Sequence, residues 1–260
     1  MKKTKNFKLT VSYDGTSFRG WQKLPGTDSE TVQGRLEKVA SLLSGYETAV
    51  NGAGRTDAGV HAIGQVANVR LPGELSCTEI RDYFNRYLPE TVRVVSCEEA
   101  SDRFHARLSA KAKTYEYYFT TGEKPPVFER KYVYRHPSAV DVSKMDDACR
   151  LLIGTHDMKG FATAVPKKKS SVRTITGASV SSADGFGLFG HGNAPDVYVI
   201  KLTGDGFLYN EVRIIAGTLL EIGSGAMDAS NITKALKTGD RHFAGFTAPA
   251  SGLFLAKVYY

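Results

Sequence analysis

The first pattern along the chain is a strict alternation of apolar and polar positions, which is typical of a half-buried strand. Its apolar members are Phe7, Leu9, Val11 and Tyr13. Apolar residues then recur at helical spacing over 32–43, and strands are predicted at 49–52 and 65–71. A second helix over 77–88 and a strand over 92–98 follow. This β-α-β-β-α-β order is the ferredoxin-like arrangement.

The same order recurs in the second half of the chain, without a detectable sequence repeat. It is predicted as a strand at 110–120, a helix at 143–152, strands at 172–181 and 197–203, helices at 207–222 and 230–237, and a strand at 254–260. The helix over 207–222 is apolar almost all round and should be buried. The predicted fold class is therefore α/β, of the α+β type. Two ferredoxin-like halves, 1–107 and 108–260, are expected to share a central, mainly antiparallel sheet with a cleft between them.

Capping signals mark where three of these helices begin. Thr31 or Ser29 can cap the first helix, and Ser143 can cap the helix after the long strand of the second half. Ser76 followed by Glu79 is a capping-box pattern, in which each side chain bonds the other residue's backbone N–H.

Composition places the chain among globular proteins and narrows its partners. Of 260 residues, 42% are hydrophobic, and 34 basic against 27 acidic side chains give a net charge of +7. Such an excess suggests a polyanionic partner. Cys77, Cys97 and Cys149 lie far apart without a CxxC pair, so neither a disulfide framework nor a zinc site is indicated and a reducing compartment fits. No signal peptide or membrane span is expected, and the predicted location is cytoplasmic.

Candidate chemistry lies in the loop 54–62, between two predicted strands. Gly54 and Gly59 allow a tight turn that could approach a ligand closely, with Asp57 presented beside Arg55. An aspartate in such a loop is most often a turn residue, and that alternative stays open. A metal site is disfavoured, because no second acidic or histidine ligand lies at a useful spacing.

The loop, Gly-Arg-Thr-Asp-Ala-Gly-Val-His-Ala, resembles the catalytic loop of the TruA-type tRNA pseudouridine synthases. Other signatures of that family are matched in the same order at 13–22, 31–33, 104–107 with 113–117, 206–213 and 247–253. One such block would be weak support. The collinear set spans nearly the whole chain.

The resemblance implies an isomerase that converts uridine to pseudouridine at positions 38–40 of the tRNA anticodon stem-loop, as a homodimer and without a cofactor. The target base must flip out of the helix, because its reacting atoms cannot be reached in the stack. Asp57 is implied as the essential carboxylate. It can attack uracil C6, attack the anomeric carbon or remove the 2′ proton, and the sequence leaves these three routes open.

Three further residues are candidates for the substrate site. A dry cleft would raise the pKa of Asp57, and Arg213 on the apolar helix could oppose this; the alternatives are a structural ion pair elsewhere or a surface arginine. Tyr115 would stack on the flipped uracil, although it could instead belong to the core with Tyr117 and Phe119. Arg55 would fill the gap left by the base, or simply contact phosphate.

Two basic runs are candidates for RNA contact. Eight Lys and Arg lie between Arg103 and Arg135, interleaved with aromatic residues, and they include Lys111 and Lys113. The second run contains Lys167, Lys168, Lys169 and Arg173. The alternative for both is a solvated loop or face.

Two other functions are weighed against the isomerase, and three positions depart from the family pattern. A non-catalytic RNA-binding module is the second hypothesis, and a glycosidase is the third, although Asp57 has no plausible carboxylate partner for that reaction. Met158 and Ala162 replace the Phe and Arg frequent in the family. Glu211 stands where a Met is frequent.

Overall fold

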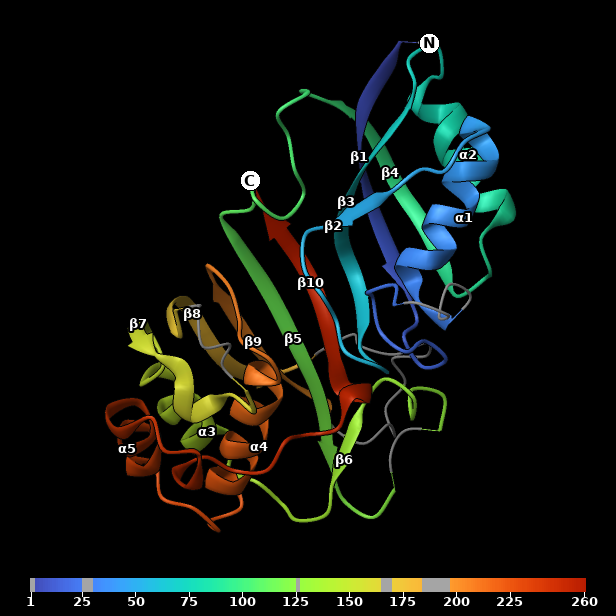
Figure 1. Ribbon diagram of the computed structural model, residues 1–260. Coiled ribbons are helices and arrows are strands. Elements are labelled where there is room, and N and C mark those ends of the chain that lie inside the picture. The colour runs from blue at the N-terminus through green and yellow to red at the C-terminus, as the bar shows by residue number, and fades with distance from the viewer. Residues whose placement is uncertain (1–2, 25–29, 125–126, 165–169, 184–196) are drawn as a thin grey trace. The chain divides into compact units, whose positions relative to one another are not determined.

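The structure is a computed structural model that describes residues 3–24, 30–124, 127–164, 170–183 and 197–260 (Figure 1). The chain divides into two compact units. One is Met1–Lys111 together with Phe254–Tyr260, and the other is Ala112–Leu253. The last strand is thus grouped with the first unit, whereas the order of elements along the chain placed it in the second half.

The first unit has the predicted β-α-β-β-α-β order. Its elements are β1 (Thr4–Tyr13), α1 (Val32–Ser44), β2 (Val50–Gly52), β3 (His61–Pro72), α2 (Cys77–Tyr87), β4 (Val92–Ala100) and β10 (Leu253–Tyr259). The strands β4, β1, β3 and β2 follow one another across an antiparallel sheet, which is the ferredoxin-like order. The strand β10 adds a parallel pairing to the start of β3.

Helices α1 and α2 cover one face of this sheet (Figure 1). Phe7, Leu9 and Val11 of β1 are fully buried, while the residues between them retain some exposure, so the predicted alternation is confirmed. Leu36 of α1 and Phe84 of α2 are also fully buried. Burial of these two apolar faces forms the core of the unit.

The caps of α1 and α2 confirm two of the three capping predictions. The Thr31 side chain accepts from the Gly34 N–H, and Gly45, at a φ of 82°, ends the helix. Ser76 and Glu79 form the full capping box of α2. Ser29, the other candidate cap of α1, lies outside the described residues.

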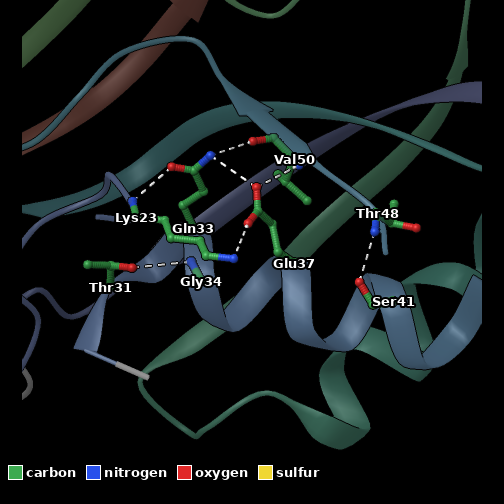
Figure 2. Close-up of polar contacts among 8 residues, drawn as sticks. All are labelled: Lys23, Thr31, Gln33, Gly34, Glu37, Ser41, Thr48 and Val50. Carbon is green, nitrogen blue, oxygen red and sulfur yellow. Dashed lines mark hydrogen bonds and ion pairs between the residues drawn. The ribbon is translucent and has the colours of Figure 1, made fainter. Parts of the chain in front are cut away.

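Side chains of α1 also hold the neighbouring backbone in place (Figure 2). Gln33 accepts from the Lys23 N–H at 2.9 Å and donates to the Val50 carbonyl at 3.0 Å. Glu37 accepts from the Val50 N–H at 3.1 Å. Gln33, from the 31–33 signature, thus ties β2 and the segment after β1 to the helix.

The second unit is also α+β, with β5 (Ala112–Thr121), β6 (Tyr134–His136), α3 (Val142–Arg150), β7 (Gly154–Asp157), β8 (Val172–Ser182), β9 (Val197–Gly204), α4 (Glu211–Gly223) and α5 (Ser230–Thr238). The strands β5, β9, β8 and β7 form an antiparallel row, and β6 pairs in parallel with β5. The mixed fold with mainly antiparallel strands is as predicted.

Two helix starts in this unit differ from the prediction. Asp141, and not Ser143, caps α3, because its carboxylate accepts the Lys144 N–H. Helix α4 begins at Glu211, four residues later than expected, since Asn210 has a left-handed backbone with a φ of 63°. The expected burial of α4 is confirmed over most of its length.

Candidate active site

Asp57 lies in the turn that joins β2 to β3. The backbone N–H of Val60 donates to the Asp57 carbonyl at 3.1 Å and closes this turn. Thr56 is buried and Arg55 is exposed, while the Asp57 side chain is half-buried. The turn therefore holds the residue before Asp57 inside the protein, while Asp57 itself keeps partial exposure.

Hydrogen bonds fix the backbone on the N-terminal side of Asp57. The Thr56 hydroxyl lies 2.7 Å from the Tyr13 hydroxyl, and the Thr56 carbonyl accepts from the Trp21 N–H at 3.0 Å. The side chain of Gln65 donates to the Gly54 carbonyl at 2.9 Å. Burial raises the pKa of Tyr13 well above its ordinary value, so the phenol stays a neutral partner.

The 13–22 signature supports the loop through two close backbone approaches. A side chain at Gly15 would overlap the Val60 carbonyl. At Gly20, where φ is +96°, a Cβ atom would lie 2.6 Å from the Thr56 carbonyl oxygen. Only glycine fits these positions without displacing the loop that carries Asp57.

His61, at the end of the loop, has a structural environment. Its Nδ1 accepts from the Gly15 N–H at 2.9 Å, and its ring stacks on Phe254 with centroids 4.7 Å apart. An Nδ1 that accepts carries no proton, so its 3.2 Å separation from Asp14 is not an ion pair. His61 is thus a hydrogen-bonding residue that holds the Gly15 backbone.

Tyr115 lies on β5 of the second unit, in one row with Tyr117 and Phe119. Tyr117 and Phe119 are fully buried, and the Tyr117 hydroxyl donates to the Pro249 carbonyl, so the core alternative holds for these two. Tyr115 retains 8% exposure and meets Phe207 edge-on at 5.2 Å between centroids. Tyr115 is therefore buried as well, and its stacking role stays a prediction.

Arg213 lies near the start of α4 and is half-buried. Its Nε donates to the Ala248 carbonyl at 2.7 Å, and one terminal nitrogen donates to Asn210 Oδ1 at 3.0 Å. The Ala248 N–H in turn donates to the Arg213 carbonyl at 3.1 Å. These contacts fix the plane of the guanidinium and tie it to the 247–253 signature.

Glu211 is a buried ionisable residue whose setting the sequence did not reveal. It is fully buried at the start of α4, where Oε2 accepts from the Leu208 N–H at 2.7 Å. Its Oε1 has no hydrogen-bond partner within the described ranges. Burial raises the pKa of Glu211 to about 8, although Arg173 acts in the opposite direction.

The proton on Glu211 makes stability depend on pH. Between about pH 4.5 and pH 8 the folded protein holds this proton and the unfolded chain releases it. This contribution to stability is complete below about pH 4.5 and is lost as the pH rises through 8. At pH 9, urea denaturation should therefore give Glu211→Gln a free energy of unfolding that is a few kcal/mol higher than that of the native protein. At pH 5 the two free energies should differ little. Glu123→Gln, at an exposed site of the same unit, should show no such crossover; parallel pH profiles for native and Glu211→Gln proteins would contradict the assignment.

The candidate RNA-binding residues have mixed settings. Lys111 is exposed, whereas the Arg173 guanidinium donates to the Ser170 carbonyl at 2.9 Å within its own turn. Lys167, Lys168 and Lys169 lie outside the described residues. In the part of the chain that the structure describes, no cluster of three metal-ligating side chains is found, and no helix has the length and apolarity to cross a bilayer.

Comparison with known proteins identifies the family. A sequence model of tRNA pseudouridine synthases matches residues 9–108 and 148–260. The chain is 41% identical to tRNA pseudouridine synthase A 2 of Bacillus cereus over 253 residues, which is 97% of this chain and 98% of that protein. It is 42% identical to tRNA pseudouridine synthase A of a Geobacillus species over 258 residues, 99% of each chain. The family that the motifs indicated is thereby confirmed: this chain belongs to the tRNA pseudouridine synthases.

Proposed function

We propose that this chain isomerises uridine to pseudouridine in tRNA, with Asp57 as the essential carboxylate. The observation that carries the proposal is the full-length match to this family, together with a matching loop in which Asp57 is half-buried on a backbone fixed by hydrogen bonds. The reaction breaks the C–N glycosidic bond and joins C5 of the same uracil to the sugar. It is an internal rearrangement, so the chemistry falls on the protein's own side chains.

Asp57 acts in one of three ways in this proposal: on uracil C6, on the anomeric carbon or on the 2′ proton. Each route requires an ionised carboxylate, since a neutral acid is neither a nucleophile nor a base. The hydrogen bonds at Gly54 and Thr56 support any of the routes, because they limit the positions that the carboxylate can reach before substrate arrives.

Three more side chains act on the same flipped uridine in the proposal. Tyr115 stacks on the uracil and holds it while it is detached and turned. Arg213 stabilises the charged form of Asp57, in keeping with its fixed guanidinium plane. Arg55, which is exposed beside Asp57, fills the space that the base leaves in the RNA.

The finer features of the proposal concern the substrate and the assembly. We infer that the target uridines are positions 38–40 of the anticodon stem-loop, that the enzyme is a cytoplasmic homodimer, and that it needs no cofactor. Lys111, Lys113, Lys167–Lys169 and Arg173 contact phosphates in this scheme, in keeping with the net charge of +7.

The proposal is tested with tRNA transcripts labelled with tritium at uracil C5. Joining C5 to the sugar displaces the C5 hydrogen, so each turnover should release one tritium to water. Purified protein should release label from stem-loops carrying a uridine at 38, 39 or 40, and not from a matched stem-loop with its uridine moved to the other side of the loop. Binding without tritium release would favour a non-catalytic RNA-binding module. If the displaced uridine released tritium equally, the isomerase activity would stand, but the assignment to positions 38–40 would be refuted.

A further inference from the structure

The fold brings together two cysteines that the sequence places 20 positions apart. Cys77 is the first residue of α2, and Cys97 lies on β4, against which α2 packs. The Cys77 thiol lies close enough to Cys97 to help raise the pKa of the Cys97 thiol. The sequence alone does not indicate this pair, because neither cysteine has a partner at short spacing.

A β-bulge in β4 explains how Cys97 reaches the helix. Val94 pairs with Val11 and Cys97 pairs with Leu9, so Val95 is an extra residue in β4, and its side chain is 52% exposed. Directly paired residues of neighbouring strands point to the same face of a sheet. Since Leu9 and Val11 are buried under the helices, Cys97 points toward α2 as well. Without the bulge the alternation would turn Cys97 to the opposite face.

The backbone on each side of the pair is fixed. The Ser76–Glu79 capping box holds the start of α2 directly before Cys77. Near the other end of the helix, the Asn85 side chain donates to the Val94 carbonyl at 2.9 Å and accepts from the Val94 N–H at 2.8 Å. Both cysteines are half-buried, which leaves them open to a small reagent, whereas Cys149 is buried in the second unit.

We propose that Cys77 and Cys97 form a redox-sensitive modification site, which closes to an intramolecular disulfide on reaction with a small-molecule disulfide such as oxidised glutathione. One protein thiolate attacks the reagent and releases one reduced glutathione. The second protein thiol then attacks the resulting mixed disulfide, releases another reduced glutathione and forms the Cys77–Cys97 bond. Two protein thiols are oxidised, one glutathione disulfide is reduced, and the two thiol protons leave with the glutathione molecules.

The surroundings of the pair suggest the order of attack. Burial, and then the neighbouring Cys77 thiol, raise the pKa of Cys97 well above its ordinary value, with Arg81 acting weakly against them. Cys97 is therefore a poor first nucleophile, because the thiolate is the reactive form. Cys77 should attack first and Cys97 should resolve the mixed disulfide. The resulting bond would join the start of α2 to β4, away from the Asp57 loop.

The test treats the full native protein with defined ratios of oxidised to reduced glutathione. We expect a mass loss of about 2 Da, for two hydrogens, and one disulfide-linked peptide containing Cys77 and Cys97. The oxidised protein should melt higher by about 5 °C or more, since a closed loop restricts the unfolded chain. Tritium release from tRNA should be unchanged.

Three single variants distinguish this site from ordinary thiol reactivity. Cys149→Ser should oxidise like the native protein. Cys97→Ser should stop at a stable mixed disulfide on Cys77, and Cys77→Ser should react far more slowly. Overturning results are a native protein that accumulates mixed disulfides on both cysteines, a linkage through Cys149 or between two chains, or an oxidised form that melts lower than the reduced one.

Discussion

Asp57→Asn is expected to abolish pseudouridine formation, by at least about a thousandfold, while the fold and tRNA affinity stay intact. The amide has nearly the shape of the carboxylate, and the half-buried position tolerates it. An amide, however, can neither attack a carbon atom nor remove the 2′ proton, so all three routes open to Asp57 fail together. Single-turnover tritium release at saturating tRNA, with a filter-binding measurement alongside, separates the loss of chemistry from a loss of binding.

A matched variant in the same unit controls for the loss of one negative charge. Asp102→Asn changes an exposed surface aspartate that pairs with Arg70, and it should leave turnover normal. If Asp57→Asn keeps more than about one part in a thousand of the native rate, another group carries the reaction. Asp57 would then be a turn residue only.

Arg213→Ala is expected to slow the chemical step by about a hundredfold and to leave tRNA affinity nearly unchanged. In the proposal the guanidinium stabilises the ionised Asp57, so its removal raises the pKa of that carboxyl. Activity, which requires the ionised form, should then reach its optimum at a higher pH. Arg213→Lys should recover only part of the rate, because one ammonium cannot reproduce the planar contacts to both Ala248 and Asn210.

Two controls separate this role from a general contribution of positive charge. Arg150→Ala removes a surface arginine paired with Asp146 in the same unit, and it should change neither rate nor affinity. Replacing Lys167, Lys168 and Lys169 with Ala should weaken tRNA binding. The slope of the logarithm of the binding constant against the logarithm of the salt concentration should fall in magnitude by roughly 0.7–0.9 for each lost phosphate contact. Weaker binding with a normal single-turnover rate in Arg213→Ala would reassign Arg213 as a phosphate contact.

Local signals predicted the fold where they act over a few residues. The predictions from the alternation over Phe7–Tyr13 and from the caps at Thr31 and Ser76 are confirmed, since each signal depends only on neighbours in the sequence. The start of α4 was missed, because the apolar pattern continues through Phe207 while the left-handed backbone of Asn210 delays the helix. Strand β7 was missed because it has only four residues and none is fully buried.

Long-range packing accounts for what the sequence could not show of the site. The motifs identified the Asp57 loop and its glycines, but not that Gly15 and Gly20 approach the backbone of the loop itself. The sequence did not reveal the burial of Glu211 either. The Met that is frequent here in the family pattern would have fitted a buried position. Cys97 faces α2 only because of a bulge, and a bulge has no reliable signal in a single sequence.

The grouping of β10 with the first unit has a consequence for synthesis on the ribosome. The second unit, Ala112–Leu253, leaves the ribosome as one uninterrupted piece, whereas the first unit must wait for Phe254–Tyr260. Until those residues arrive, His61 lacks the Phe254 ring on which it stacks, and the Asp57 loop lacks part of its support. A nascent chain thus contains the Asp57 loop long before the ring contact that supports the end of this loop at His61 can form.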